Sequence, residues 1–141
     1  GCLTARHQYY SRAARDQRLR NRIMEALLSL AEMDLTWGFS EYFEGFYDFV
    51  PHKTDGSMHK NSAMTQAERA AILEVSRLMD QACDSTPGKM TPREFEAAGW
   101  PQKIVPAAKA ALALMLERGR FSEEFEEVVP SGTGLPTRSN A

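Results

Sequence analysis

Three observations predict an all-α fold, a compact bundle of about four to five helices with a mobile C-terminal tail. The stretch from Ser11 to Met33 has no glycine or proline and is rich in residues of high helix propensity. Segments 65–68 and 91–94 are capping boxes, in which a threonine N-cap is followed three residues later by a glutamate. No segment alternates apolar and polar residues as a strand does. A chain of 141 residues is long enough to bury the core of one domain.

The first predicted helix, over 11–33, carries apolar residues on two sides. At about 100° per residue, one face holds Leu19, Ile23, Ala26, Leu27 and Leu30. A second strip holds Met24, Leu28 and Ala31. A helix that is apolar on two sides either lies in the centre of its fold or offers one side to a partner. A homodimer is therefore one open alternative.

The middle of the chain predicts two further helices. A short helix over about 40–49 ends before Pro51, because the residue that precedes a proline is pushed out of the helical region. The polar stretch 51–64 is expected to be a loop. The first capping box then opens a helix from Thr65 to about Cys83.

The last third predicts a short helix and a long one. The short helix starts at Thr91 and ends near Gly99. The long helix runs from about Gln102 or Pro106 to Arg118 and is apolar nearly all round, which is typical of a buried helix. The predicted organisation is a loose lead-in over 1–10, a single helical domain over 11–127 and a flexible tail over 128–141.

Composition excludes several classes of protein. The net charge of −2 does not favour a nucleic-acid partner, and no apolar run is long enough to span a membrane. Cys2 and Cys83 are too few for a disulfide framework, which favours a reducing, cytoplasmic location. The start Gly1-Cys2 fits a trimmed product, the end of a bacterial lipobox or a myristoylation signal. A membrane partner is expected only if Cys2 is lipidated.

The sequence contains no pattern that carries catalysis, so an enzyme is not favoured. His7, His52 and His59 lack the spacing of a metal site, and no phosphate-binding glycine loop or nucleophile motif is present. Glu41, Glu44 and Asp48 stand three and four residues apart, a spacing that could serve acid–base chemistry but more often places solvated acids on one helical face. We therefore predict no catalytic residue, no metal site and no cofactor.

The segment 37–49 is the main candidate for a binding surface. It holds seven aromatic residues, more than half of those in the chain, together with three acids and no basic residue. The alternative is that the rings fill the core, but about half of a short helix faces outward, so not all seven rings can be buried. Exposed rings beside acids are typical of a surface that binds a basic protein. The predicted partner-binding residues are Trp37, Glu41, Tyr42, Glu44, Phe46, Tyr47 and Asp48.

Four arginines give an alternative site on the first helix. Arg12, Arg15, Arg18 and Arg22 lie along one side of it, where they could contact the phosphates of a nucleic acid. Their stems can instead cover apolar surface while the charged ends pair with acids. An acidic run near the C-terminus supplies such acids, namely Glu117, Glu123, Glu124, Glu126 and Glu127. We favour this pairing, so nucleic acid is the less favoured partner.

The order of these features resembles a group of known proteins. The features are an arginine–isoleucine–leucine pattern (Arg20, Ile23, Leu27, Leu30), the acidic aromatic stretch, Met79-Asp80, the element Thr91 to Phe95, and Gly99-Trp100-Pro101. They resemble small uncharacterised all-helical bacterial proteins, some of which are grouped with immunity proteins that neutralise toxins. The resemblance implies a stoichiometric binder rather than a catalyst, and it assigns no functional residue. The basic first helix departs from a uniformly acidic immunity surface.

Overall fold

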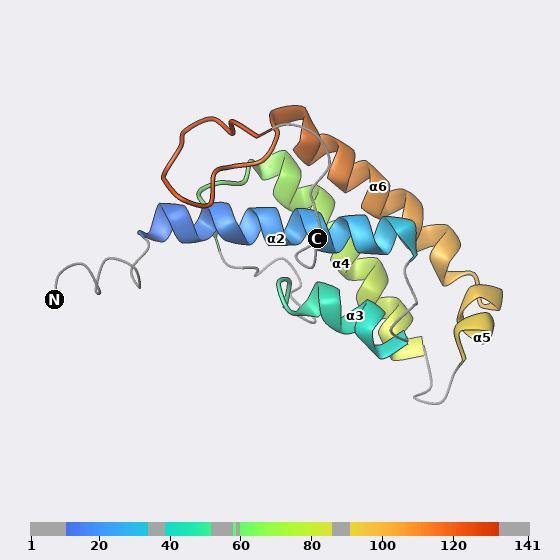
Figure 1. The fold of residues 1–141 in the computed structure, drawn as a ribbon. Helices are drawn as coiled ribbons and strands as arrows, with labels where there is room; N and C mark the ends of the chain where they lie inside the picture. The colour runs from blue at the N-terminus through green and yellow to red at the C-terminus, as the bar shows by residue number, and fades with distance from the viewer. Residues whose placement is uncertain (1–10, 34–38, 52–57, 59, 86–90, 133–141) are drawn as a thin grey trace, which may run out of the picture.

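The structure is a computed structural model, which describes residues 11–33, 39–51, 58, 60–85 and 91–132. Within these ranges the helices are α2 (Arg12–Glu32), α3 (Phe39–Tyr47), α4 (Gln66–Ser85), α5 (Pro92–Ala97) and α6 (Trp100–Arg118) (Figure 1). The described residues form no strand, only an isolated bridge between Arg120 and Gly132. The predicted all-α bundle is thus confirmed. The expected lead-in over 1–10 lies outside the described residues.

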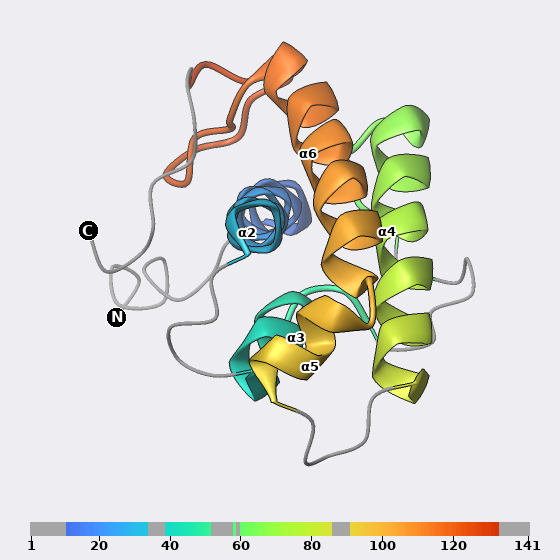
Figure 2. The same ribbon diagram turned by 90° about the vertical axis from the view of Figure 1, so that its right-hand side faces the viewer.

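Helix α6 packs against both of the other long helices. The long helices α4 and α6 pack side by side, and α2 crosses them and packs against α6 (Figure 2). The short helices α3 and α5 lie together at one end of the molecule, where α3 contacts α2 and α5 contacts α6. Helix α6 therefore lies between α2 and α4 and joins the three long helices into one bundle.

Both apolar strips of helix α2 contact the core. Ile23, Met24, Leu27 and Leu30 are all buried, although they come from different strips. Leu28 and Ala31 are half-buried against the same core. Ser11 caps the start of the helix, since its Oγ accepts from the backbone N–H of Ala14 at 3.1 Å. The two-sided pattern is thus accounted for within one chain.

Both predicted capping boxes are present. At the start of α4, the N–H of Glu68 donates to the Thr65 hydroxyl at 3.1 Å, and the Glu68 carboxylate accepts from the N–H of Thr65 at 3.0 Å. At the start of α5, Thr91 and Glu94 exchange the same two bonds, at 3.1 and 3.0 Å. These bonds satisfy N–H groups that a helix start would otherwise leave without a partner.

Helix α6 begins earlier than the sequence predicted. It starts at Trp100, so the Trp100-Pro101 pair that suggests a corner belongs to the first turn instead. A proline is tolerated there because the first N–H groups of a helix have no intrahelical acceptor. The change of direction between α5 and α6 falls on Gly99, whose φ of 88° is easily reached only by glycine.

A buried ion pair joins three helices. Arg20 is fully buried and donates to the two carboxylate oxygens of Glu68, at 3.2 and 2.8 Å. It also donates to the backbone carbonyls of Met115 and Gly119, at 3.0 and 2.7 Å. Arg118 donates to the same carboxylate at 2.8 Å. An unpaired buried charge destabilises a protein by roughly 3–5 kcal/mol, so α2, α4 and α6 must dock in the arrangement that pairs these groups.

The chain after α6 folds back onto α2 rather than leaving the domain. Figures 1 and 2 show this segment returning from the end of α6 to lie along α2. Arg120 and Gly132 close it by exchanging two backbone hydrogen bonds, at 3.0 and 2.8 Å. We expected a flexible tail from residue 128. The bridge places Gly132 beside Arg120, and the flexibility of the tail stays a prediction. Residues 133–141 lie outside the described part of the chain.

None of the described helices is both long and apolar enough to cross a membrane.

Candidate functional site

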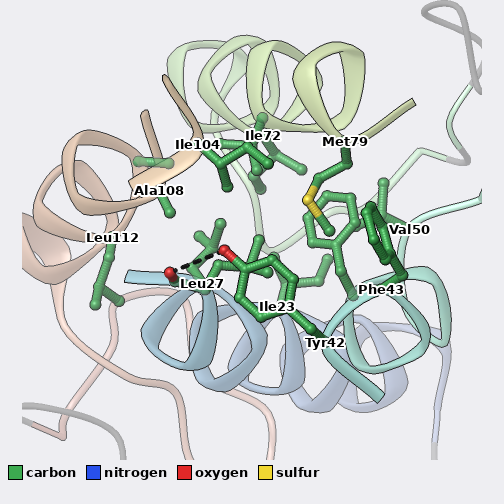
Figure 3. Packing of buried hydrophobic residues seen from close by; sticks show 14 of the residues in the cluster. Ile23, Leu27, Tyr42, Phe43, Val50, Ile72, Met79, Ile104, Ala108 and Leu112 are labelled. Carbon is green, nitrogen blue, oxygen red and sulfur yellow. Dashed lines mark hydrogen bonds between the residues drawn. The ribbon is translucent and has the colours of Figure 1, made fainter. Parts of the chain in front are cut away.

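The aromatic segment 37–49 contributes mainly to the core. Tyr42 and Phe46 are 4% and 1% exposed, so the prediction that they form a contact surface is wrong. Figure 3 shows Tyr42 and Phe43 pointing into the core, where the Tyr42 hydroxyl donates to the Leu30 carbonyl at 3.3 Å. Both rings also pack edge-on against Phe95, with centroids 5.9 and 5.7 Å away. The space between α3, α5 and the longer helices needs large side chains, and these rings fill it.

Part of the same segment stays at the surface. Glu44 and Asp48 are exposed, and Tyr47 is half-buried. The Tyr47 hydroxyl donates to Asp80 at 2.8 Å. Burial, and then this bond to a carboxylate, raises the pKa of Tyr47 well above its usual range, so the hydroxyl stays protonated. The two other predicted contacts, Trp37 and the side chain of Glu41, lie outside what the structure describes.

The predicted arginine row is divided between two environments. Arg18 lies 3.9 Å from Glu123, and Arg22 forms ion pairs with Glu123 and with Glu25, the latter at 2.8 Å. The predicted pairing of the helix with the acidic run is thus confirmed for these two arginines. Arg12 and Arg15 lie one to two turns earlier and line a separate hollow instead. The four arginines therefore do not act as one continuous basic face.

Four acids of the predicted run, Glu123, Glu124, Glu126 and Glu127, lie in a loop, residues 120–132, which we call the acidic loop, whereas Glu117 belongs to α6. A buried side chain of α2, Gln17, holds the middle part of the loop in place. The Gln17 amide donates to the carbonyls of Ser122 and Phe125, at 3.0 and 2.9 Å, and its oxygen accepts from the N–H of Glu127 at 2.8 Å. Gln17 is 2% exposed, so this network is shielded from water.

A second buried residue of α2 holds the start of the acidic loop. Asn21 exchanges hydrogen bonds with the backbone of Phe121, donating at 2.9 Å and accepting at 3.3 Å. It also donates to Glu123 at 3.1 Å. Phe121 is buried beneath the guanidinium groups of Arg20 and Arg118, which lie 5.3 and 5.5 Å from the ring centroid. The loop is therefore fixed at its start, its middle and its closing bridge.

The outer side of the acidic loop is apolar and exposed. Phe125, Val128 and Val129 are 58%, 91% and 70% exposed, and among the described residues they are the exposed large hydrophobic side chains. Glu124 and Glu126, on either side of Phe125, are exposed as well. A ring between acids is the arrangement that the sequence suggested for 37–49, found here in another segment. The local signal is the run Glu-Glu-Phe-Glu-Glu, which fits neither a helical nor a strand pattern.

Two hollows lie on either side of the segment 58–64. One is an apolar pocket of about 260 Å³ between α2 and the residues after α3. It is lined by Leu19, Ile23, Tyr47, Asp48, Phe49, Pro51, Met58, Asn61 and Met64. The other is a wider, charged hollow of about 550 Å³ at the start of α2 and α4. Arg12, Asp16, Lys60 and Arg69 contribute its charges.

No candidate metal site is found in the part of the chain that the structure describes. Within it, no three His, Cys, Asp or Glu residues come together as a metal ion would require. The three histidines of the sequence fall outside the described residues. Cys83 is half-buried against the core, as expected for a small apolar side chain.

Comparison with known proteins found no matching family model, no similar curated protein and no similar solved structure. The resemblance to small helical immunity-like proteins therefore stays a prediction from the sequence.

Proposed function

We propose that this protein is a protein-interaction module that binds a basic partner through the acidic loop. The observation that carries the proposal is the exposure of Phe125, Val128 and Val129 on a loop that buried side chains of α2 hold in place. Large exposed apolar side chains that are clustered, rather than scattered singly, mark interaction sites on globular proteins.

The way in which the loop is anchored suits binding. Ordering a flexible segment during association costs free energy, and a segment that is already ordered avoids this loss. Gln17 and Asn21 hold the backbone of the loop against α2 by hydrogen bonds. Phe125 and the two valines are not needed to fix the loop and can remain accessible to a partner. An aromatic side chain that enters a pocket of the partner is the common form of an interface hot spot.

The charge of the loop supports a basic partner. Glu124 and Glu126 are exposed beside Phe125, although the Glu126 carboxylate accepts from the Ser11 hydroxyl, whereas Glu123 is paired with Arg18 and Arg22. Exposed acids around an apolar centre attract a positively charged surface and raise the rate of association. A more specific version of this proposal is that the protein neutralises a basic toxin, as its resemblance to immunity-like proteins implies.

The surface part of 37–49 supports a secondary contact. Glu44 and Asp48 are exposed, and they add acids that a basic partner could reach. Nucleic acid has less support as a partner, because Arg18 and Arg22 already pair with acids of the same chain.

The direct test is quantitative capture of a partner from lysate of the native source. The variant Phe125→Ala removes the central ring and is expected to weaken capture at least fivefold, since loss of a hot-spot side chain exceeds about 1 kcal/mol. Because this side chain is 58% exposed, the variant should unfold at nearly the wild-type temperature. The exposed residue Arg93 of α5 provides a control, Arg93→Gln, which should capture as the wild type does. Equal capture by Phe125→Ala and the wild type contradicts the proposal.

A further inference from the structure

The apolar pocket beside α2 has walls that hydrogen bonds fix in place. The Asn61 side chain donates to the Asp16 carbonyl at 3.0 Å, and Ser62 donates twice to the Asp16 carboxylate, at 2.9 and 2.8 Å. Arg69 donates to the Met58 carbonyl at 2.5 Å. These bonds tie the segment that carries Met58, Asn61 and Met64 to α2 and α4. The pocket is therefore a built feature of the fold.

The pocket and the charged hollow are contiguous, because Asn61 and Met64 line both of them. Leu19, Phe49 and Met58 line only the apolar side. Arg12 and Lys60 lie only on the charged side. These two cations are exposed, and neither forms a hydrogen bond or an ion pair with the rest of the described chain. An apolar recess thus opens next to two cations that are available to a ligand.

We propose that this composite site binds a free, single-chain carboxylate amphiphile, an alkyl acid of medium length. Its chain occupies the apolar pocket, and its carboxylate lies between Arg12 and Lys60. This binding site is independent of the acidic loop and of the proposed partner. It gives a role to two features that the proposed function does not use, namely the apolar pocket and the cations Arg12 and Lys60.

Size and charge favour this class of ligand. A cavity of roughly 150 Å³ holds a benzene molecule, so the pocket of about 260 Å³ can hold a chain of several carbons. The carboxylate of Asp16 offsets part of the positive charge of Arg12, Lys60 and Arg69, so the hollow stays positive and favours an anionic ligand. Asp48 lines the apolar pocket but not the charged hollow, so it disfavours a reversed orientation.

Calorimetric titration at low ionic strength with butanoate, hexanoate and octanoate, each below its aggregation concentration, tests the apolar half of the site. Affinity should rise roughly three- to fourfold for each added CH₂ group. Octanoate should bind about two- to fivefold more tightly than 1-octanol, which has the same chain without the charge. Inorganic phosphate alone should show no saturable binding.

The double variant Arg12→Gln/Lys60→Gln tests the charged half. It should abolish the preference for octanoate over 1-octanol and leave the affinity for 1-octanol unchanged. A matched control, Arg93→Gln/Lys109→Gln, removes the same charges from exposed positions on α5 and α6 and should retain the preference. In the wild type, octanoate should shift the methyl NMR signals of Met58 and Met64 but not that of the buried Met115.

Several results would overturn the assignment. An affinity that does not rise with chain length contradicts the apolar half of the site. An unchanged preference of the double variant for octanoate over 1-octanol contradicts the charged half. Shifts confined to other methyl groups place the ligand elsewhere. Binding to phosphatidylglycerol vesicles without binding to monomeric octanoate assigns the cations to a membrane surface and contradicts a free ligand. Because the titration needs no protein partner, its failure is distinguishable from failure of the proposed interaction.

Discussion

Replacement of Gln17 by leucine should release the acidic loop while leaving the helical bundle folded. The side chain of Gln17 is 2% exposed and makes three hydrogen bonds with the loop, to Ser122, Phe125 and Glu127, at 3.0, 2.9 and 2.8 Å. Leucine has a similar size but cannot form any of them. Each lost bond is worth about 1 kcal/mol, and part of the loss is recovered when water reaches the freed groups. We expect the free energy of opening the loop to fall by about 2–3 kcal/mol.

Amide hydrogen exchange measures this change directly. The N–H of Glu127 donates to Gln17, so its protection reports whether the middle of the loop is closed. A fall of about 2–3 kcal/mol corresponds to exchange that is roughly 30- to 150-fold faster. Amides in the middle of α2 and α4 should change much less, because the hydrophobic core still holds these helices together.

Gln81 supplies a matched control. It is exposed on α4, so Gln81→Leu makes the same chemical change without removing a bond to the loop. Unchanged exchange of Glu127 in Gln17→Leu would refute the view that this buried amide fixes the loop. Equal acceleration across the whole chain would refute it too, because the loop would then open only when the domain unfolds.

Three further predictions follow from other contacts. The variant Arg20→Met should lower the free energy of unfolding by about 3–5 kcal/mol in urea titrations, because it strips Glu68 of its fully buried partner; wild-type stability would contradict this. The variant Gly119→Ala should lower the melting temperature, because φ is 97° there and an added Cβ would collide with the backbone of the closing bridge. Hydrogen bonds from the Ser131 hydroxyl and from a backbone N–H lower the pKa of Glu127. The ionised carboxylate therefore stabilises the closed acidic loop fully at pH values above the ordinary pKa of a glutamate, and this stabilisation is lost as pH falls through the lowered pKa. NMR titration should show the loop loosening only in that acidic range.

The sequence was most informative where the determinants of structure are local. The capping boxes at Thr65 and Thr91 depend on residues three positions apart, and both predictions are confirmed. The two apolar strips of α2 both contact the core, although the sequence alone left open whether one of them faced a partner. The start of α6 was misplaced because Trp100-Pro101 fits both a corner and the first turn of a helix.

The site was harder to predict because long-range contacts form it. Tyr42 and Phe46 have the composition of an interface, but the neighbouring α2 and α5 decide that they are buried. Gln17 contacts Phe125 across 108 positions of sequence, and nothing near either residue indicates the bond. Arg20 shows the same effect, since nothing local distinguishes it from the half-buried Arg18 and Arg22, and only Glu68, 48 positions later, pairs with it in the core.

Photo-crosslinking from position 125 in cells of the native source tests the central claim most directly. A benzoyl derivative of phenylalanine at this position would react with whatever the exposed ring of the acidic loop contacts. We predict one adduct with a basic protein, formed less efficiently when Glu124 and Glu126 are changed to Gln, and no such adduct from position 93 on α5. Absence of an adduct from position 125, together with a specific adduct from Glu44 or Tyr47, would contradict the assignment of the acidic loop as the binding surface.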